Sequence, residues 1–484
     1  MDILFVSTEL LPYVKVGGLA DVAAALPKAL RALGHKVTLV VPRFPAFEEG
    51  GLLVARRLTP LRFDYAGEQT DVTLFDGRLA SQVDVILVDA PGLYESGVVY
   101  GDDASAETNA KKFGILSAAA AEVARQRAIS GQPVDVVVAN DWPAAATVAH
   151  VARHRAETPE LAKTRTVLVV HNVEHQGVFP KEALATLGLP KSAFTVDLAE
   201  FYGKVNLLKL GARTADAIVA VSPTYAREIV EKDGGHGLEG VFASVKDRLT
   251  GILNGIDYGV WNPATDAALS VRYDAEDLAP RARCKGALQK ELDLPIEIGA
   301  PLIANVGRMV SQKGTDLLAA LIPKILKASE AQIVVCGDGQ EDLVEKVTAA
   351  VKKSHGRAVF VRAAPEGLVH RVFSAADLVL VPSRREPCGL VQMYAQRYGA
   401  LPVVRATGGL VDTVVDCDAK LETGTGFTFG DEDEFLAAVE RGVAARAHER
   451  WPVLTRRVMR LDRSWDGPAR RYEQLFKQLV ARPS

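Results

Sequence analysis

The fold is decided by the stretch ILFVSTELLPYVKVGGLADVAAALPKALRALGHKVTLVV, which occupies residues 3–41. Short apolar runs at 3–6 and 37–41 are typical of strands that are buried on both faces. Between them, apolar residues from Leu19 to Leu33 recur three and four positions apart, which predicts a helix with one apolar face. A strand, a helix and a second strand in this order predict a doubly wound α/β fold with a parallel sheet.

The same alternation continues along the chain and then restarts. Further strands are predicted at 85–88, 134–138, 167–170 and 217–221 in a first set, and at 302–306, 333–336, 359–361, 378–381 and 402–404 in a second. Between the sets, residues 251–257 (GILNGID) and 261–263 (WNP) are rich in turn and breaker residues. A chain of 484 residues is long enough for two large α/β domains. We therefore predict a first domain at 1–252 and a second at 253–463, facing each other across a cleft.

The end of the chain predicts one more helix. After Asp466-Gly467-Pro468, five apolar side chains fall on one helical face, namely Tyr472, Leu475, Phe476, Leu479 and Val480. Such a stripe needs a surface to cover. The pattern alone allows that surface to lie on the helix's own domain or on the first one.

Charge and cysteine content exclude several classes of protein. The 57 Lys and Arg residues against 60 Asp and Glu leave a net charge of −3, so we expect neither nucleic acid nor a membrane as a partner. The 4 cysteines form no CxxC pair, which argues against a disulfide framework or a zinc site and favours a reducing cytosol. The first residues lack the features of a signal peptide, and no apolar run approaches the ~20 residues of a membrane span. We therefore expect a cytoplasmic protein.

Polar and glycine-rich residues follow the predicted strands, where ligands of parallel α/β sheets bind. In the first domain, Lys15-Val16-Gly17-Gly18 separates the first strand from its helix. Paired glycines let backbone amides approach a phosphate or sugar and Lys15 adds a charge, although a tight turn explains the glycines equally well. The segment is not the GxGxxG fingerprint, so an NAD-dependent oxidoreductase is not indicated. His171 directly follows the strand at 167–170, without the spacing of a metal site.

In the second domain, Arg308 and Lys313 follow the first strand, five positions apart. Both can point at one anion, which suits a diphosphate, or can form an ordinary solvated pair. Thr407-Gly408-Gly409 can form a nest of amides for a phosphate or simply start a helix. Glu386 lies between a buried strand and a helix, where a carboxylate can receive sugar hydroxyls or stabilise positive charge at an anomeric carbon. A surface glutamate beside arginines, here Arg384 and Arg385, is nevertheless the commoner case.

These segments together resemble the bacterial glycogen synthase and plant starch synthase family of retaining glucosyltransferases, which has the two-Rossmann-domain glycosyltransferase B (GT-B) architecture. The resemblance runs through nearly the whole chain. It is carried by Lys15 to Val22 (KVGGLADV), His171-Asn172 with Gln176-Gly177, Val221 to Ala226 (VSPTYA), Gly251 to Asp257, Trp261-Asn262-Pro263, Gly307-Arg308, Gln312-Lys313-Gly314, Pro382 to Arg384, Glu386 to Leu390 (EPCGL), and Arg405 to Val414.

The resemblance implies transfer of glucose from ADP-glucose to the non-reducing 4-hydroxyl of an α-1,4-glucan, either glycogen or a maltooligosaccharide. It implies retention of the α configuration, with no metal or organic cofactor. It also implies that a C-terminal helix at 464–484 crosses back onto the first domain. Retention can use a carboxylate nucleophile and a double displacement, but the chain shows no second carboxylate at a recognisable partner spacing. The resemblance implies a front-face route instead, in which the leaving phosphate accepts the proton of the acceptor, and we favour this route.

Residue by residue, the resemblance assigns three groups of side chains. The catalytic group is Glu386, His171, Arg308 and Lys313. The donor-binding group adds Lys15, Gly17, Gly18, Asn254, Cys388, Gly389, Leu390, Tyr394, Thr407, Gly408 and Gly409. The acceptor group is Asp21, Asp141 and Trp142.

Some positions depart from the family pattern. Asn140 and Pro143 flank Asp141-Trp142 where the family often has histidines, and Ala363-Ala364-Pro365 stands where it often has an aromatic residue near the adenine. Related enzymes have a second Glu at the position of Tyr394, which favours the glycogen synthase branch over the sucrose-phosphate synthase branch. The alternatives are a UDP-glucose-dependent or small-acceptor GT-B enzyme and a two-lobed sugar-binding protein without catalysis.

Overall fold

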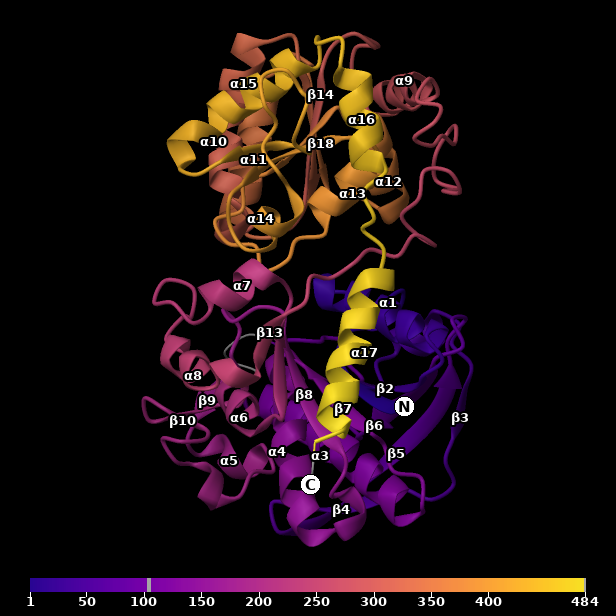
Figure 1. Ribbon diagram of the computed structural model, residues 1–484, viewed down its shortest axis with the longest axis vertical. Helices are drawn as coiled ribbons and strands as arrows, with labels where there is room; N and C mark the ends of the chain where they lie inside the picture. Colours follow the sequence, from indigo (N-terminus) through magenta and orange to yellow (C-terminus); the bar gives the residue numbers. More distant parts are fainter. Residues whose placement is uncertain (102–105, 483–484) are drawn as a thin grey trace. The chain divides into compact units, whose positions relative to one another are not determined.

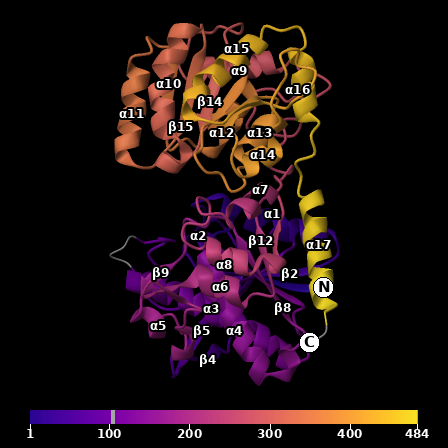
Figure 2. The ribbon, with the colours of Figure 1, turned by 60° about the vertical axis from the view of Figure 1, so that its left-hand side comes forward.

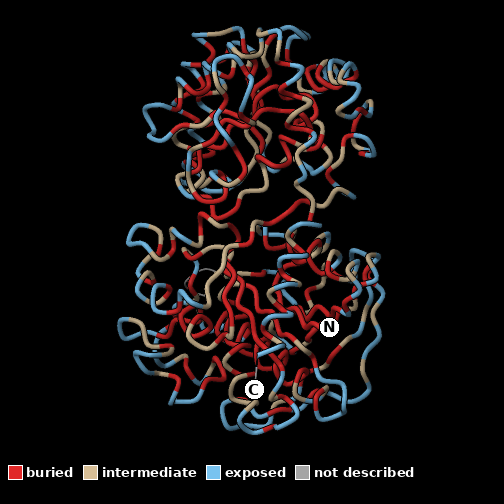
Figure 3. The backbone as a smooth tube through the Cα atoms, viewed as in Figure 1, coloured by how far each residue is buried: buried red, intermediate tan, exposed pale blue. Residues whose placement is uncertain are grey.

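The computed structural model describes residues 1–101 and 106–482 of the chain. The chain divides into two compact units (Figure 1). The first contains residues 1–254 together with 465–484, and the second contains residues 255–464. In each unit the buried residues gather along the strands and the inner faces of the helices (Figure 3).

The core of the first unit is a ten-stranded sheet with β1 (Asp2–Val6) near its centre. Phe5 of β1 pairs in parallel with Leu39 on one side and with Val138 on the other. Its remaining parallel strands are β2 (Lys36–Pro42), β6 (Asp84–Asp89), β7 (Val136–Asn140), β8 (Arg165–Val170), β12 (Ala217–Ala220) and β13 (Leu249–Gly251). Because helices cover both faces of the central strands, these strands read in the sequence as continuous apolar runs.

One edge of this sheet is antiparallel and was not predicted. It consists of β3 (Val54–Arg56), β4 (Leu61–Tyr65) and β5 (Glu68–Arg78). Leu61, Phe63 and Tyr65 are buried and alternate with exposed residues, so β4 has one wet face and lacks the continuous apolar run that marked the other strands. The structure also starts β7 at Val136, two residues later than predicted.

Helices and one small sheet surround the main sheet. The helices are α1 (Gly18–Ala32), α2 (Ala46–Glu49), α3 (Ala106–Ile129), α4 (Asp141–Glu157), α5 (Ala183–Thr186), α6 (Leu207–Thr214), α7 (Pro223–Glu228) and α8 (Glu239–Ser244). The small antiparallel sheet is formed by β9 (Val178–Pro180), β10 (Glu200–Phe201) and β11 (Lys204–Asn206).

The last helix, α17 (Asp466–Val480), is part of the first unit and packs beside α1 (Figures 1 and 2). Its apolar face buries Tyr472, Phe476 and Leu479. Arg165 at the start of β8 donates to the carbonyl oxygen of Leu479 at 3.2 Å, so the helix is also held by its C-terminal end.

The second unit is built on a six-stranded parallel sheet in the order β16-β15-β14-β17-β18-β19. The strands are β14 (Leu302–Val306), β15 (Gln332–Gly337), β16 (Ala358–Arg362), β17 (Leu378–Val381), β18 (Leu401–Arg405) and β19 (Phe427–Phe429). The helices are α9 (Arg281–Glu291), α10 (Thr315–Ala328), α11 (Glu341–Lys352), α12 (Glu366–Ala375), α13 (Val391–Arg397), α14 (Gly409–Thr413), α15 (Phe435–Ala445) and α16 (Trp451–Met459). Among the described residues of both units, no helix is long and apolar enough to cross a bilayer.

Candidate functional site

The loop between β1 and α1 is organised by a buried carboxylate, Glu9, which is 3% exposed. Glu9 Oε2 accepts the backbone N–H groups of Val16 and Gly17, both at 2.7 Å. Glu9 Oε1 accepts the hydroxyl of Tyr100 at 2.8 Å, and burial raises the pKa of that hydroxyl, which keeps it protonated. The amide of Gly17 is therefore engaged inside the protein. What the loop presents outward is Lys15 and the space above Gly17, where an added Cβ would meet no atom within 4 Å.

Two predicted residues of this loop region form an ion pair. Lys15 Nζ lies 3.1 Å from a carboxylate oxygen of Asp21, in the first turn of α1. A cavity of about 400 Å³ borders the same loop, with Lys15, Tyr13 and Tyr100 among its lining residues. The predicted donor residue Lys15 and acceptor residue Asp21 thus share one polar corner of the first unit.

Asp141 joins the ends of two strands. It is the first residue of α4, with a φ of 55°, a left-handed conformation that is uncommon for a non-glycine residue and is typical of functional sites. Its carboxylate accepts the backbone N–H of His171 at 2.7 Å and that of Asn172 at 3.3 Å. Burial raises the pKa of Asp141 to about 7, although these two amides act in the opposite direction.

The imidazole of His171 is held in one tautomer. His171 Nε2 lies 3.0 Å from Asn140 Oδ1, and Asn140 Nδ2 donates to the carbonyl oxygen of Val6 at 2.9 Å. Since the asparagine oxygen is the acceptor, Nε2 carries the proton and Nδ1 carries the lone pair. Burial lowers the pKa of His171 to about 3, so the ring is neutral at physiological pH.

Trp142 packs within an aromatic cluster of the first unit. Its ring centroid lies 4.9 Å from that of Phe113, 5.9 Å from Phe179 and 6.2 Å from Tyr100. Gly177 permits this packing, because a Cβ there would lie 2.3 Å from the indole. Asn254, at the end of the first unit, is buried, and its Oδ1 has no hydrogen-bond partner in the described part of the chain.

In the second unit, Lys313 and Glu386 meet although 73 positions separate them. Lys313 Nζ lies 2.7 Å from Glu386 Oε1 and 2.6 Å from Oε2. Gly314 makes this approach possible, because its φ is 69° and a Cβ there would lie 2.2 Å from the carbonyl oxygen of Pro382. Ser383 donates its hydroxyl to Glu386 Oε2 at 2.8 Å, so the carboxylate is fixed from two sides.

Arg384 holds the same two loops together from outside the pair. Its guanidinium donates to both carboxylate oxygens of Asp316, at 2.7 and 2.8 Å, and its backbone N–H donates to the carbonyl oxygen of Gln312 at 2.8 Å. Arg308, by contrast, is exposed, and its guanidinium makes no hydrogen bond or ion pair within the described part of the chain. Lys313, the other cation predicted here, already binds Glu386.

The two glycine turns of this unit pack against each other. Gly409 donates its N–H to the carbonyl oxygen of Glu386 at 2.9 Å, and a Cβ on Gly409 would lie 2.1 Å from the carbonyl oxygen of Cys388. Gly389 has a φ of 74° and, like Leu390, is partly exposed. The structure therefore brings the 386–390 and 407–409 segments side by side, as their predicted shared role requires.

The other predicted donor residues of this unit differ in exposure. Cys388 is 6% exposed. The ring of Tyr394 is stacked on Trp261 with 3.8 Å between centroids. Thr407 is partly exposed, whereas Gly408 is buried.

Two further observations concern ligands. In the described residues no three His, Cys, Asp or Glu side chains gather as a metal site would require.

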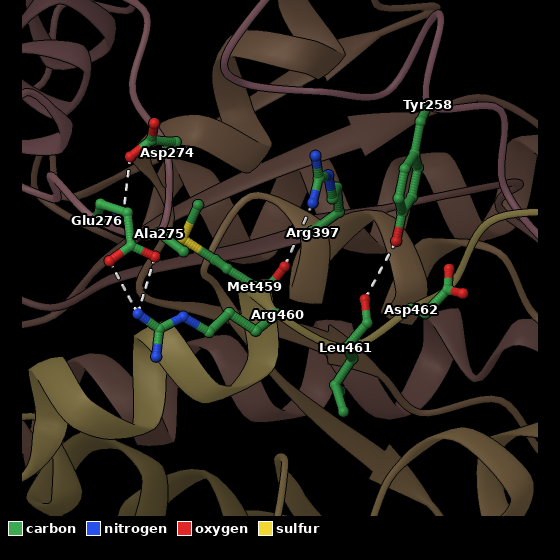
Figure 4. Close-up of a pocket in the computed structure, with 9 residues that line it drawn as sticks. All are labelled: Tyr258, Asp274, Ala275, Glu276, Arg397, Met459, Arg460, Leu461 and Asp462. Atoms are coloured by element: carbon green, nitrogen blue, oxygen red, sulfur yellow. Dashed lines mark hydrogen bonds and ion pairs between the residues drawn. The ribbon is translucent and has the colours of Figure 1, made fainter.

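A second cavity, of about 390 Å³, lies in the second unit among Tyr258, Arg397, Arg460 and Glu276 (Figure 4). None of the predicted site residues lines this cavity, whereas Lys15 lines the cavity of about 400 Å³ in the first unit. Cavity size alone therefore does not identify the candidate site.

Comparison with known proteins places the chain in a family. The family model described as starch synthase catalytic domain matches residues 2–244, and that for glycosyl transferases group 1 matches 292–450. A glycogen synthase of an Anaeromyxobacter species is 43% identical over 491 residues, which cover 99% of this chain and 100% of the relative. The chain belongs to the glycogen synthase and starch synthase family.

Two further proteins of the family are similar to this chain over nearly its whole length. Glycogen synthase 2 of Geobacter sulfurreducens is 39% identical and covers 99% of this chain and 98% of its own. The solved catalytic domain of Starch Synthase IV from Arabidopsis thaliana, bound to ADP and acarbose, has a TM-score of 0.91 at 31% identity over 99% of both chains. The chain is therefore a glucosyltransferase of the glycogen synthase and starch synthase family with the GT-B fold, which confirms the predicted family, fold class and enzyme class.

Sequence reasoning did not single out Tyr100 and gave Glu9 no specific role. Glu9 stands among polar residues after the first strand, but nothing local shows that its carboxylate turns back onto Val16 and Gly17. Tyr100 lies 91 positions from Glu9. The only signal in the sequence was the polar strand end itself.

Proposed function

We propose that this glucosyltransferase transfers glucose from ADP-glucose to the non-reducing 4-hydroxyl of an α-1,4-glucan with retention of configuration, elongating glycogen. The observation that carries the proposal is the Lys313–Glu386 pair beside the Gly389 and Gly409 turns. It places a cation, a fixed carboxylate and two glycine turns at one end of a parallel sheet, where nucleotide ligands bind. Starch Synthase IV, the similar solved structure, is bound to ADP and acarbose. The buried thiols of all 4 cysteines suit a cytoplasmic enzyme.

On the donor side, Arg308 and Lys313 are proposed to bind the diphosphate. As the bond between the glucose C1 and the phosphate oxygen breaks, negative charge grows on ADP, and cations placed there stabilise the transition state more than the ground state. Arg308 contributes a planar fork of donors and Lys313 a point charge. Glu386 is proposed to accept hydroxyls of the donor glucose while Lys313 and Ser383 hold its carboxylate in place.

Retention is proposed to follow a front-face route. The acceptor oxygen forms its bond to C1 on the side that ADP leaves, and the acceptor proton passes to the departing phosphate oxygen. Two carboxylates of the first unit that could otherwise act as nucleophiles are engaged, because Glu9 accepts two amides and a hydroxyl, and Asp141 accepts two amides. Neutral His171 is proposed to accept a sugar hydroxyl through Nδ1, since its Nε2 proton is held by Asn140.

The proposal is tested by supplying labelled ADP-glucose or UDP-glucose with glycogen or a short maltooligosaccharide and measuring label in the polymer. Efficient transfer from ADP-glucose to both acceptors is expected. Preference for UDP-glucose would replace the donor assignment, and transfer to a small acceptor alone would replace the acceptor assignment. Absence of transfer from either donor by folded protein would leave the two-lobed binding protein as the better account.

A further inference from the structure

Gln392, in the first turn of α13, is completely buried beside the two glycine turns of the second unit. Its Nε2 donates to the carbonyl oxygens of Cys388 at 3.1 Å and Gly389 at 2.9 Å. The same nitrogen lies 3.0 Å from Thr413 Oγ1, so its two N–H groups are shared among three acceptors. One side-chain amide thus holds the first glycine turn and reaches α14, the helix that begins at the second turn.

Thr413 completes the connection. Its side chain is 1% exposed, and Oγ1 donates to the carbonyl oxygen of Gly409 at 2.7 Å. Gly409 in turn donates its N–H to the carbonyl oxygen of Glu386 at 2.9 Å. These hydrogen bonds run from Glu386 through Gly409, Thr413 and Gln392 to Gly389. Because the backbone joins Gly389 to Glu386, they form a closed ring.

The turns are packed on this ring without room for side chains. A Cβ on Gly389 would lie 2.5 Å from Gln392 Oε1, and this oxygen is buried without a hydrogen-bond partner among the described residues. An unpaired buried acceptor opposes folding. A methionine would remove this unpaired acceptor, but it would also take the donor away from the carbonyl oxygens of Cys388 and Gly389.

The ring is also tied to both ends of the second unit. Gln396 donates to the carbonyl oxygen of Thr413 at 3.0 Å, and Arg463 donates to Gln396 Oε1 at 3.0 Å and to the same carbonyl. The backbone N–H of Arg463 donates at 2.8 Å to the hydroxyl of Tyr258, which lines the cavity in Figure 4. Residues near the start and the end of the unit therefore brace the ring.

We infer that Gln392 is a positioning residue for the proposed donor site of the second unit. It sets where the Gly389 and Gly409 turns lie relative to Glu386, and it acts through their backbone without touching the sugar nucleotide. The inference rests on the proposed function, in which these turns bind ADP-glucose. Its consequence is that loss of the amide weakens donor binding while leaving acceptor binding intact.

The test uses the full-length enzyme with two kinds of substitution. Gln392→Met keeps the volume and removes the donors, and Thr413→Val removes the hydroxyl with little change of shape. Each is expected to weaken ADP binding and raise the KM for ADP-glucose by roughly tenfold or more, with the KM for maltooligosaccharide unchanged. Thr413→Ser keeps the hydroxyl and is expected to restore most of the affinity that Thr413→Val loses.

The matched control is Gln289→Met. Gln289 is also completely buried in the second unit, donates to the carbonyl oxygen of Glu297 at 3.0 Å and to Gln332 Oε1 at 2.9 Å, and has an unpaired Oε1. It makes no hydrogen bond to either glycine turn, so its substitution is expected to change Tm and leave the Kd of ADP unchanged.

A result in which Gln392→Met behaves like Gln289→Met, with altered Tm and unchanged ADP binding, overturns the inference. The proposed donor site then still stands if Lys313→Ala weakens ADP binding. If Lys313→Ala leaves the Kd of ADP unchanged, the proposed site is wrong and the inference falls with it. Should Gln392→Met fail to fold, the comparison of Thr413→Val with Thr413→Ser decides the question in the same way.

Discussion

Lys313 Nζ lies within 2.7 Å of both carboxylate oxygens of Glu386, a residue that is 8% exposed. The pair joins the loop after β14 to the loop after β17, and it combines the charge proposed for the diphosphate with the carboxylate proposed for the glucose. Because Glu386 is buried, removal of Lys313 would leave the carboxylate without its ion-pair partner.

Substitution of Lys313 by Ala is expected to lower kcat/KM for ADP-glucose by roughly 10²- to 10³-fold, since the leaving ADP loses a preorganised cation. It is also expected to lower Tm, because Glu386 keeps a buried charge without its partner. The control is Lys346→Ala, which breaks a pair with Asp342 whose side chains are 57% and 66% exposed. An unchanged rate in Lys313→Ala would remove the lysine from the mechanism.

Glu9→Gln is expected to loosen the Lys15 loop. An amide at this position cannot accept from Val16, Gly17 and Tyr100 all at once, so we expect a loss of about 1–3 kcal/mol in unfolding free energy and a fall of kcat/KM by roughly tenfold. Denaturant melts and steady-state kinetics measure the two effects. Glu48→Gln, which alters an exposed pair with Arg43, is the control and is expected to change neither. Wild-type kinetics in Glu9→Gln would mean that the loop position does not matter for catalysis.

The pH dependence of stability is expected to reflect His171. Burial lowers its pKa to about 3 from the ordinary 6.5, so the folded state favours the neutral ring. The associated stability is complete above pH ~6.5 and is lost as pH falls from there toward 3. His171→Gln is therefore expected to flatten the decline of Tm on the acid side. His150, whose pKa burial also lowers to about 3, acts in the same direction, and the double variant is expected to flatten the curve further.

Asp141 is expected to change the pH dependence of stability in the opposite direction to His171. Because burial raises its pKa to about 7 from 3.8, the folded state favours the protonated carboxyl, and the associated stability is lost as pH rises from about 4 through 7. Asp141→Asn keeps an oxygen for the amides of His171 and Asn172 and carries no charge. We expect its Tm to decline less than that of the wild type between pH 5 and 8. An identical slope would contradict a raised pKa.

Alanine substitution is expected to affect stability at Gly314 and activity at Gly17. Gly314→Ala forces a Cβ to within 2.2 Å of the Pro382 carbonyl oxygen at a φ of 69°, so a loss of about 2–4 kcal/mol is expected. Gly17 has an extended φ of −145° and open space around its Cβ position. Gly17→Ala is therefore expected to leave Tm unchanged while lowering kcat/KM, if substrate approaches this backbone as proposed. A wild-type rate in Gly17→Ala would place the substrate elsewhere.

The central strands and their helices were predictable because they are local patterns. An apolar run of four or five residues marks a strand buried on both faces, and spacing of three and four marks α1. The antiparallel edge escaped prediction because β4 is buried on one face only, so its signal is an alternation rather than a run. The candidate site residues were singled out as polar strand ends and by family resemblance, and they remain a prediction, whereas the contacts that they make could not be predicted.

The sequence by itself determined the alternation of strands and helices, the restart that yields a second sheet, and the family. These depend on neighbours within a few positions or on motifs at set intervals. The tertiary structure alone decided that Glu9 binds the Lys15 loop and Tyr100, that Lys313 meets Glu386, and that Gln392 links the Gly389 turn to Thr413. Except for Glu9 with its own loop and Gln392 with the adjacent Gly389, such contacts join residues far apart in the chain. They form only when folding of the whole sheet brings the strand ends together, and no local pattern encodes them.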